Sequence, residues 1–267
     1  MRVSNSNDPS IYLSLIGFIV VGLVGGALLA STGVIGPFLV PALLLLGLSS
    51  DVARGTTLVS ELIMTLVSVI GHNRERNLDK RIILAYLPGA ATVVLGAKIS
   101  LNFPELFMKL FIGVFEIVIG ILMIMTTAKL VAERGSKNNI TAGTMVKLMA
   151  VALLAGFTKG FFGAGWGPIG VGLFVLLGIN PRIVVGSSLA IRLLLDVTGG
   201  ATYASMNLVD VNAVVPLTAA GCIASLLAVE LTKNGFRKKK PTHISRHCNH
   251  YPLSTSHHRN IIFQKIL

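Results

Sequence analysis

A few charged side chains occur within long apolar segments of this sequence. Glu61 lies in SELIMTLVSVI and Arg192 in SLAIRLLLDVTGG, 131 residues apart. If these segments lie in lipid, each charge costs roughly 2.5–3.5 kcal/mol at the bilayer centre, so it normally faces a partner or a water-filled cavity. In one interpretation, Arg192 binds a substrate anion with its planar guanidinium, while Glu61 carries a coupling proton or releases the anion. In the other, the charges only join helices, Arg192 pairing with Glu61 or with Asp196 one turn away.

Other side chains are candidates for the same site. Four hydroxyl residues occur in two similar blocks, Gly55-Thr56-Thr57-Leu58 and Gly186-Ser187-Ser188-Leu189. They are placed either to bind an anion or to pack helices together, as small hydroxyl residues do in lipid. Lys159 either reaches the anion or extends to the membrane surface. Trp166 either lines the pocket or only packs, and Glu116 either packs or relays protons.

The elements that must position these residues are apolar helices. Hydrophobic residues make up 53% of the 267 residues and charged residues 13%, which indicates a membrane protein. Five or six apolar stretches approach the roughly 20 residues that cross a bilayer, whereas two are about half as long. The stretches are 11–31, 36–48, 52–72, 81–99, 107–131, 148–162, 167–179, 183–203 and 211–231. The fold class is therefore predicted as all-α and polytopic.

The two short stretches, 36–48 and 167–179, are predicted to be half-helices. They begin in TGVIGPFLVPALLLLG and GAGWGPIGVGLFVLLG, and proline suits the first helical turn because its missing N–H would be unpaired there. Their N-termini, at Gly36-Pro37 and Gly167-Pro168, would carry partial positive charge and free N–H donors at membrane depth. Such helix ends favour an anion.

The two hairpin regions are copies of one another. They align without a gap at an offset of 131, which superimposes the Gly-Pro pairs and the Gly-[Ser/Thr]-[Ser/Thr]-Leu blocks. Lys and Arg cluster near 74–81, 129–147 and 237–240, which places these loops and the basic C-terminal tail in the cytoplasm. The first hairpin then opens to the outside and the second to the inside, so we predict inverted repeats related by an axis in the membrane plane, as in many secondary transporters.

The paired hairpins, the glycine-rich turn before each short helix and the Gly-[Ser/Thr]-[Ser/Thr]-Leu block resemble the sulfite exporter TauE/SafE family over about residues 12–231. The resemblance implies a multi-pass transporter of small anions such as sulfite, sulfonates or related sulfur-containing organic acids. It also implies an exporter that works by alternating access in the cell membrane. An anion channel or a non-transporting membrane subunit is the alternative.

The domain organisation follows from these features: an N-terminal segment (1–10), a first repeat (11–131), a cytoplasmic linker (132–147), a second repeat (148–232) and a basic polar tail (233–267). The tail stands where the repeat predicts a further helix, and we expect that the reading frame is disrupted or truncated after about Lys233. His243, His247 and Cys248 lack a second ligand cluster, so no metal site is predicted.

Several function classes are disfavoured by the sequence. No HExxH, GxSxG or CxxC motif and no phosphate-binding P-loop occurs, so we expect neither an enzyme nor a cofactor. The net charge of +12 comes largely from the eight Lys and Arg residues after Glu230, which is typical of a cytoplasmic tail and not of nucleic-acid binding. The expected partners are the lipid bilayer, a small anion and a coupling proton.

Overall fold

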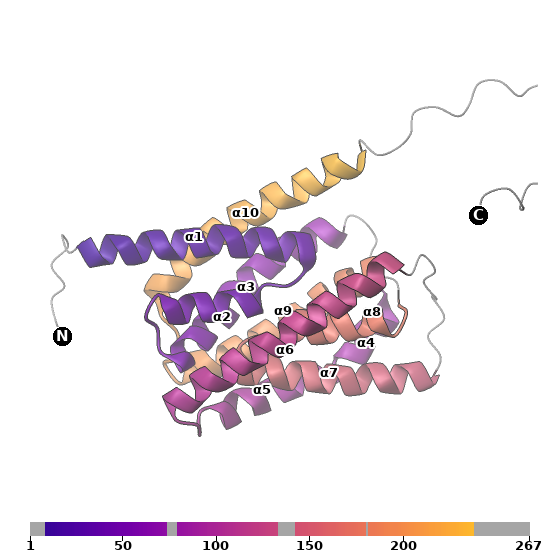
Figure 1. The fold of residues 1–267 in the computed structure, drawn as a ribbon, viewed down its shortest axis with the longest axis horizontal. Helices are drawn as coiled ribbons and strands as arrows, with labels where there is room; N and C mark the ends of the chain where they lie inside the picture. Colours follow the sequence, from indigo (N-terminus) through magenta and orange to yellow (C-terminus); the bar gives the residue numbers. More distant parts are fainter. Residues whose placement is uncertain (1–8, 74–78, 133–141, 180, 238–267) are drawn as a thin grey trace, which may run out of the picture. The chain divides into compact units, whose positions relative to one another are not determined.

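The computed structural model describes residues 9–73, 79–132, 142–179 and 181–237 (Figure 1). These residues form helices and no strand, as predicted. The helices are α1 Pro9–Thr32, α2 Gly36–Leu45, α3 Ser50–Asn73, α4 Lys80–Tyr86, α5 Pro88–Ser100, α6 Glu105–Ala132, α7 Ala142–Phe162, the π-helix η1 Trp166–Gly172, α8 Leu173–Leu176, α9 Pro181–Ser205 and α10 Val211–Arg237.

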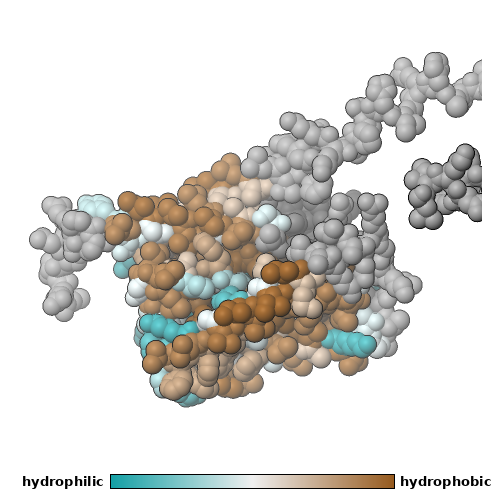
Figure 2. Space-filling model, in the orientation of Figure 1, coloured by the Kyte–Doolittle hydropathy of each residue, from teal (hydrophilic) through white to brown (hydrophobic). Residues whose placement is uncertain are grey.

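Five helical segments of the described residues are long and apolar enough to cross a membrane. They cover Tyr12–Ser31, Lys80–Ser100, Glu105–Met125, Gly143–Phe162 and Val211–Ala228. Large apolar side chains on α6 are exposed, including Val114, Ile117 and Ile124, and apolar residues dominate the visible surface in Figure 2. A water-soluble protein rarely exposes an apolar area of this extent, so lipid surrounds this surface. The chain is a multi-pass membrane protein.

Two long helices, α3 and α9, carry more charge and lie against each other. A Cβ atom on Gly55 would lie 2.9 Å from the Tyr203 side chain, and one on Gly199 would lie 3.1 Å from the Leu58 side chain. A residue later in α3 therefore contacts a residue earlier in α9, so the two helices run antiparallel. Because each shields the polar side of the other, both tolerate charged residues within their apolar length.

Each predicted half-helix follows a tight turn. The first turn has Gly33 at φ 72°, and the second has Gly163 at φ 73° and Gly165 at φ 108°. Only glycine adopts such angles without strain, which explains why the sequence is glycine-rich there. After the first turn α2 is a regular helix, whereas after the second turn the chain forms the π-helix η1 before α8. π-helices are rare and occur frequently at functional sites.

Several predicted boundaries differ from the structure. The stretch 81–99 is divided into α4 and α5 at Leu87, because Pro88 has no N–H to continue the helical ladder. Helix α7 begins at Ala142, earlier than the predicted 148, since Lys147 interrupts the apolar pattern without ending the helix. At the other end of the chain α10 extends to Arg237, into the predicted tail (233–267), and the rest of that tail, with His243, His247 and Cys248, lies outside the described residues.

The halves make reciprocal contacts. Asp210 N donates to Thr56 Oγ1 at 3.0 Å, and Asp79 N donates to Ser187 Oγ at 2.8 Å. Thr56 and Ser187 are 131 residues apart, as are Asp79 and Asp210. Exchanging the halves therefore converts one contact into the other, which is the property of an isologous two-fold interface. These contacts favour a two-fold relation between the halves, while their opposite orientation in the membrane stays a prediction.

Glycines let α5 and α7 approach closely. A Cβ atom on Gly160 would lie 1.9 Å from the Val93 carbonyl oxygen, and one on Gly156 would lie 2.1 Å from the Gly89 carbonyl oxygen. Helix α1 meets α10 in the same way at Gly26. Small residues favour helix association in lipid because they let the backbones approach closely. Apolar side chains gain no free energy by moving from lipid into a helix interface.

We expect Gly160→Ala to separate α5 from α7 and to destabilise the protein by about 1–3 kcal/mol, the usual effect of overpacking. The measurement is thermal unfolding in detergent. Gly113→Ala on α6 is the matched control, because a Cβ atom there meets nothing within 4 Å. Equal melting temperatures for the two variants would contradict this account of the α5–α7 contact.

Candidate functional site

Four charged side chains form a closed cluster between α3, α7 and α9. Lys159 Nζ lies 2.6 Å from Glu61 Oε2 and 2.7 Å from Asp196 Oδ1. Arg192 Nη2 lies 2.9 Å from Glu61 Oε2, and Arg192 Nε lies 3.8 Å from Asp196 Oδ2. None of these side chains is more than 2% exposed. We call Glu61, Lys159, Arg192 and Asp196 the buried quartet.

The repeat explains why the buried quartet assembles. Glu61 and Arg192 occupy equivalent positions of α3 and α9, and so do Thr65 and Asp196. Both pairs are in contact, Thr65 Oγ1 donating to Asp196 Oδ2 at 3.2 Å. Equivalent residues can touch each other only near a two-fold axis, so the buried quartet lies where the two halves meet. Lys159 is the asymmetric member, since its equivalent in the first half is Leu28.

The two hairpin turns meet beside the buried quartet. A Cβ atom on Gly36 would lie 2.9 Å from the Ala164 backbone, and one on Gly167 would lie 2.7 Å from the Val34 side chain. Arg192 Nη1 donates to the Gly33 carbonyl at 2.8 Å, which ties the cluster to the first turn. The structure thus brings Gly36-Pro37 and Gly167-Pro168 together, as the anion-site hypothesis requires. Interrupted backbone at membrane depth must be buried in protein, and this placement buries Gly36, Gly167 and Pro168.

The electrostatics of the buried quartet are balanced. Two cations face two carboxylates, so the cluster is neutral and its charges compensate one another's lost hydration. At an effective dielectric constant near 20, two unit charges 4 Å apart interact by about 4 kcal/mol. Removing one charge therefore leaves its partner buried without this stabilising interaction. Glu61 Oε1 is also buried without a hydrogen-bond partner in the described part of the chain. A site with this balance resists an anion until one carboxylate moves or is neutralised.

The predicted site residues separate into those that join the buried quartet and those that do not. Lys159 does not extend to the surface as one interpretation held, because both carboxylates hold its ammonium group inside the protein. Thr57 Oγ1 is buried and, among the described residues, has no hydrogen-bond partner, so it remains available to a ligand. Thr56 and Ser187 instead accept from the backbone N–H groups of Asp210 and Asp79, just before α10 and α4.

Two further candidates, Trp166 and Glu116, lie outside the buried quartet. Trp166 Nε1 donates to the Ser188 carbonyl at 3.3 Å, and the centroid of the Trp166 ring lies 4.8 Å from that of the Tyr86 ring. Trp166 is 1% exposed, so its surroundings in this structure are protein on all sides. Glu116 lies on α6, where its Oε1 is buried with no hydrogen-bond partner in the described residues. No contact joins Glu116 to the buried quartet within that part of the chain.

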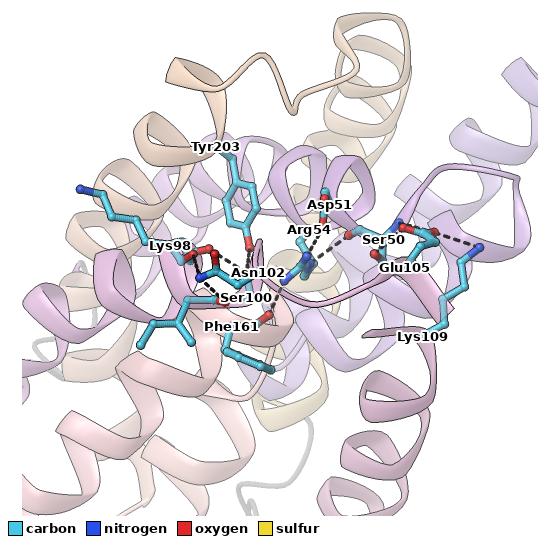
Figure 3. Close-up of polar contacts among 12 residues, drawn as sticks. Ser50, Asp51, Arg54, Lys98, Ser100, Asn102, Glu105, Lys109, Phe161 and Tyr203 are labelled. Atoms are coloured by element: carbon cyan, nitrogen blue, oxygen red, sulfur yellow. Dashed lines mark hydrogen bonds and ion pairs between the residues drawn. The ribbon is translucent and has the colours of Figure 1, made fainter. Parts of the chain in front are cut away.

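Sequence reasoning missed Arg54, which lies at the centre of Figure 3. Its Nη1 donates to the Phe161 carbonyl at 2.6 Å, and Tyr203 Oη donates to the Gly160 carbonyl at 2.9 Å. These carbonyls belong to the last turn of α7, where the helix supplies no following N–H group to bond them. Arg54 and Tyr203 therefore cap the end of α7 immediately after Lys159 and fix the position of that residue.

The sequence held a weak signal for Arg54. It follows Asp51 by three residues in SSDVARGTTL and forms an ion pair with it. An Asp-Arg pair near the expected start of a helix is typical of a solvated helix end. Its complete burial, with Nε donating to the Ser50 carbonyl at 3.0 Å, is a consequence of tertiary packing alone.

Within the described residues, no group of three or more His, Cys, Asp or Glu side chains is arranged to hold a metal ion. The chemistry of the buried quartet is therefore that of paired charges: it can bind a charged ligand by exchange of ion-pair partners, and it can bind a proton at a carboxylate.

Comparison with known proteins decides the family. The profile of the family described as sulfite exporter TauE/SafE matches residues 18–239. The chain belongs to the sulfite exporter TauE/SafE family. The resemblance inferred from the Gly-Pro hairpins is thereby confirmed, and the family is one of membrane transporters and not of enzymes, as expected.

Two relatives of this TauE/SafE protein come from Bacillus subtilis (strain 168). The probable membrane transporter protein YdhB is 29% identical over 162 residues, which cover 59% of this chain and 65% of YdhB. The probable membrane transporter protein YtnM is 26% identical over 225 residues, which cover 82% of this chain and 75% of YtnM. The match thus spans just under two thirds of YdhB. A comparison with solved structures found no significant match.

Proposed function

We propose that this TauE/SafE protein is a secondary transporter, acting as an exporter of small anions such as sulfite, sulfonates or related sulfur-containing organic acids. It would work by alternating access in the cell membrane, with its basic tail in the cytoplasm. One observation carries the proposal: two buried cations, Lys159 and Arg192, lie beside the meeting point of two interrupted helices. Intramembrane charges placed at such breaks are typical of transporter substrate sites.

In the proposed cycle the substrate anion replaces a carboxylate as the partner of Arg192. The guanidinium presents donors that match the oxygens of a sulfonate or sulfite, and Lys159 supplies a second cation. Thr57 Oγ1 and the N–H of Gly36 at the start of α2 supply further donors, since Pro37 has no N–H. A coupling proton on a carboxylate of the buried quartet would release the cations for this exchange.

The reciprocal contacts supply a physical route to alternating access. Two equivalent halves with similar interfaces can rock about the shared axis, so that the site opens first toward one hairpin and then toward the other. In the described structure the buried quartet is closed to solvent, which corresponds to an occluded state of such a cycle.

Flux into proteoliposomes tests the proposal. We expect saturable uptake of sulfite and sulfonates, measured with and without a proton gradient, well above that of protein-free liposomes. Flux that rises linearly with concentration and never saturates would favour the alternative, an anion channel. Absence of any flux would favour a non-transporting membrane subunit.

A further inference from the structure

The charge balance of the buried quartet constrains what crosses with the anion. Lys159 and Arg192 contribute two positive charges, and Glu61 and Asp196 contribute two negative charges. Side-chain exposure of 2% or less means that water cannot compensate an added charge. An anion that enters this neutral site alone would leave one buried negative charge without a partner. A proton that enters alone would leave one positive charge without a partner.

Because each ligand removes the charge that the other creates, the two bind with positive cooperativity, and linkage makes the effect reciprocal. Anion binding favours protonation of the site, and protonation favours anion binding. Antiport requires the opposite sign, since there the proton and the anion must exclude each other. The geometry therefore favours symport over antiport.

The contacts also indicate which carboxylate takes the proton. Glu61 Oε2 has two close cations, Lys159 at 2.6 Å and Arg192 at 2.9 Å. Asp196 has one close cation, Lys159 at 2.7 Å, while Arg192 Nε is 3.8 Å away and Thr65 supplies only a neutral hydroxyl. No other charged side chain among the described residues contacts either carboxylate. Neutralising Asp196 therefore sacrifices less ion-pair attraction than neutralising Glu61.

We propose that Asp196 carries one proton for each anion, so that the protein co-transports a proton with a singly charged anion and moves no net charge. This inference rests on the proposed function and adds its coupling. With Asp196 protonated, the buried quartet carries a net charge of one, which a monoanion such as a sulfonate or hydrogen sulfite neutralises. A dianion such as sulfate leaves an excess negative charge. The proton binds on the side where the anion enters and leaves with it on the other side, so net export occurs when the outward anion gradient exceeds the inward proton gradient.

The probe is methanesulfonate in proteoliposomes containing a trapped pH indicator. Sulfonic acids are strong acids that do not cross lipid as the neutral acid, so any proton movement reports the protein. We expect an inward methanesulfonate gradient to acidify the lumen, with one proton per anion. A membrane potential imposed with valinomycin and potassium should leave the rate unchanged, and sulfate should move at least about tenfold more slowly.

Asp196→Asn is the test of the residue. The amide mimics a permanently protonated carboxyl group, so we expect exchange of labelled methanesulfonate for unlabelled to persist, while proton-driven accumulation is lost and affinity no longer depends on pH. Lys109→Met, on the exposed surface of α6, is the control and should behave as the wild type.

The outcomes separate the two proposals. Three results would overturn the proposed coupling but not the proposed transport: methanesulfonate flux without proton movement, flux with protons moving the opposite way, and flux with net charge transfer. If the Asp196→Asn variant retained the coupling, a group other than Asp196 would carry the proton. Should the Asn variant fail to fold, the wild-type stoichiometry still decides the sign of the coupling. No saturable flux in the wild type would overturn the proposed function and the coupling with it.

Discussion

Arg192→Gln should reduce anion flux by at least about 30-fold at subsaturating substrate. That factor corresponds to about 2 kcal/mol, the lower end of the loss when one partner of a buried charge pair is removed. The glutamine retains part of the side-chain volume but has neither the charge nor the guanidinium that binds two oxygens together. Initial rates of sulfonate uptake over a range of concentrations measure the change.

A double variant separates binding from structure. Arg192→Gln alone leaves Glu61 with one cation fewer, so part of its effect could come from misfolding. Arg192→Gln combined with Glu61→Gln removes one positive and one negative charge and keeps the cluster neutral. We expect this double variant to fold and to remain inactive. If it transports at wild-type rates, Arg192 and Glu61 form a structural pair and the anion site lies elsewhere.

Lys159→Met should cause the largest loss of stability, about 3–5 kcal/mol, because it leaves Glu61 and Asp196 as two buried carboxylates with Arg192 as their remaining cation. The measurement is thermal unfolding of the purified protein in detergent. The matched control is Lys109→Met, whose partner Glu105 is 3.0 Å away on a surface where both side chains are nearly half exposed. An exposed pair contributes at most about 1 kcal/mol, so the control should unfold near the wild-type temperature.

A second substitution should restore stability in the Lys159→Met background. Adding Asp196→Asn removes the excess negative charge and leaves Glu61 paired with Arg192 at 2.9 Å. We therefore expect the double variant to be more stable than Lys159→Met alone, with a coupling energy of roughly 1–3 kcal/mol in a double-mutant cycle. Strictly additive effects would show that Lys159 and Asp196 do not interact as the structure indicates.

Much of the fold follows from local physical chemistry and was predicted. Hydrophobic stretches of about 20 residues can be satisfied only in lipid, and Gly-Pro pairs at the start of shorter stretches permit only interrupted helices there. The offset of 131 residues identified Glu61 and Arg192 as equivalent positions before any contact was known. Their contact at 2.9 Å was one of the alternatives, and the structure shows it by placing this pair of equivalent residues near the two-fold axis.

Other features depend on contacts between distant segments. Whether Lys159 reaches the surface or the interior depends on the carboxylates that α3 and α9 bring within 2.7 Å, and a flexible side chain in isolation permits both outcomes. The complete burial of Arg54 depends on the open end of α7, more than 100 residues later in the chain. Neither position carries a local pattern that would distinguish the alternatives.

By itself, then, the sequence determined an all-helical membrane protein made of two related halves with a broken helix in each, since length, hydropathy and repeat offset are properties of the chain alone. Only the tertiary structure decided that Lys159 and Asp196 complete the cluster around Glu61 and Arg192, and that the cluster is neutral. The reason is electrostatic: a buried charge is stable only beside its counter-charge, and which groups become neighbours depends on how the helices pack.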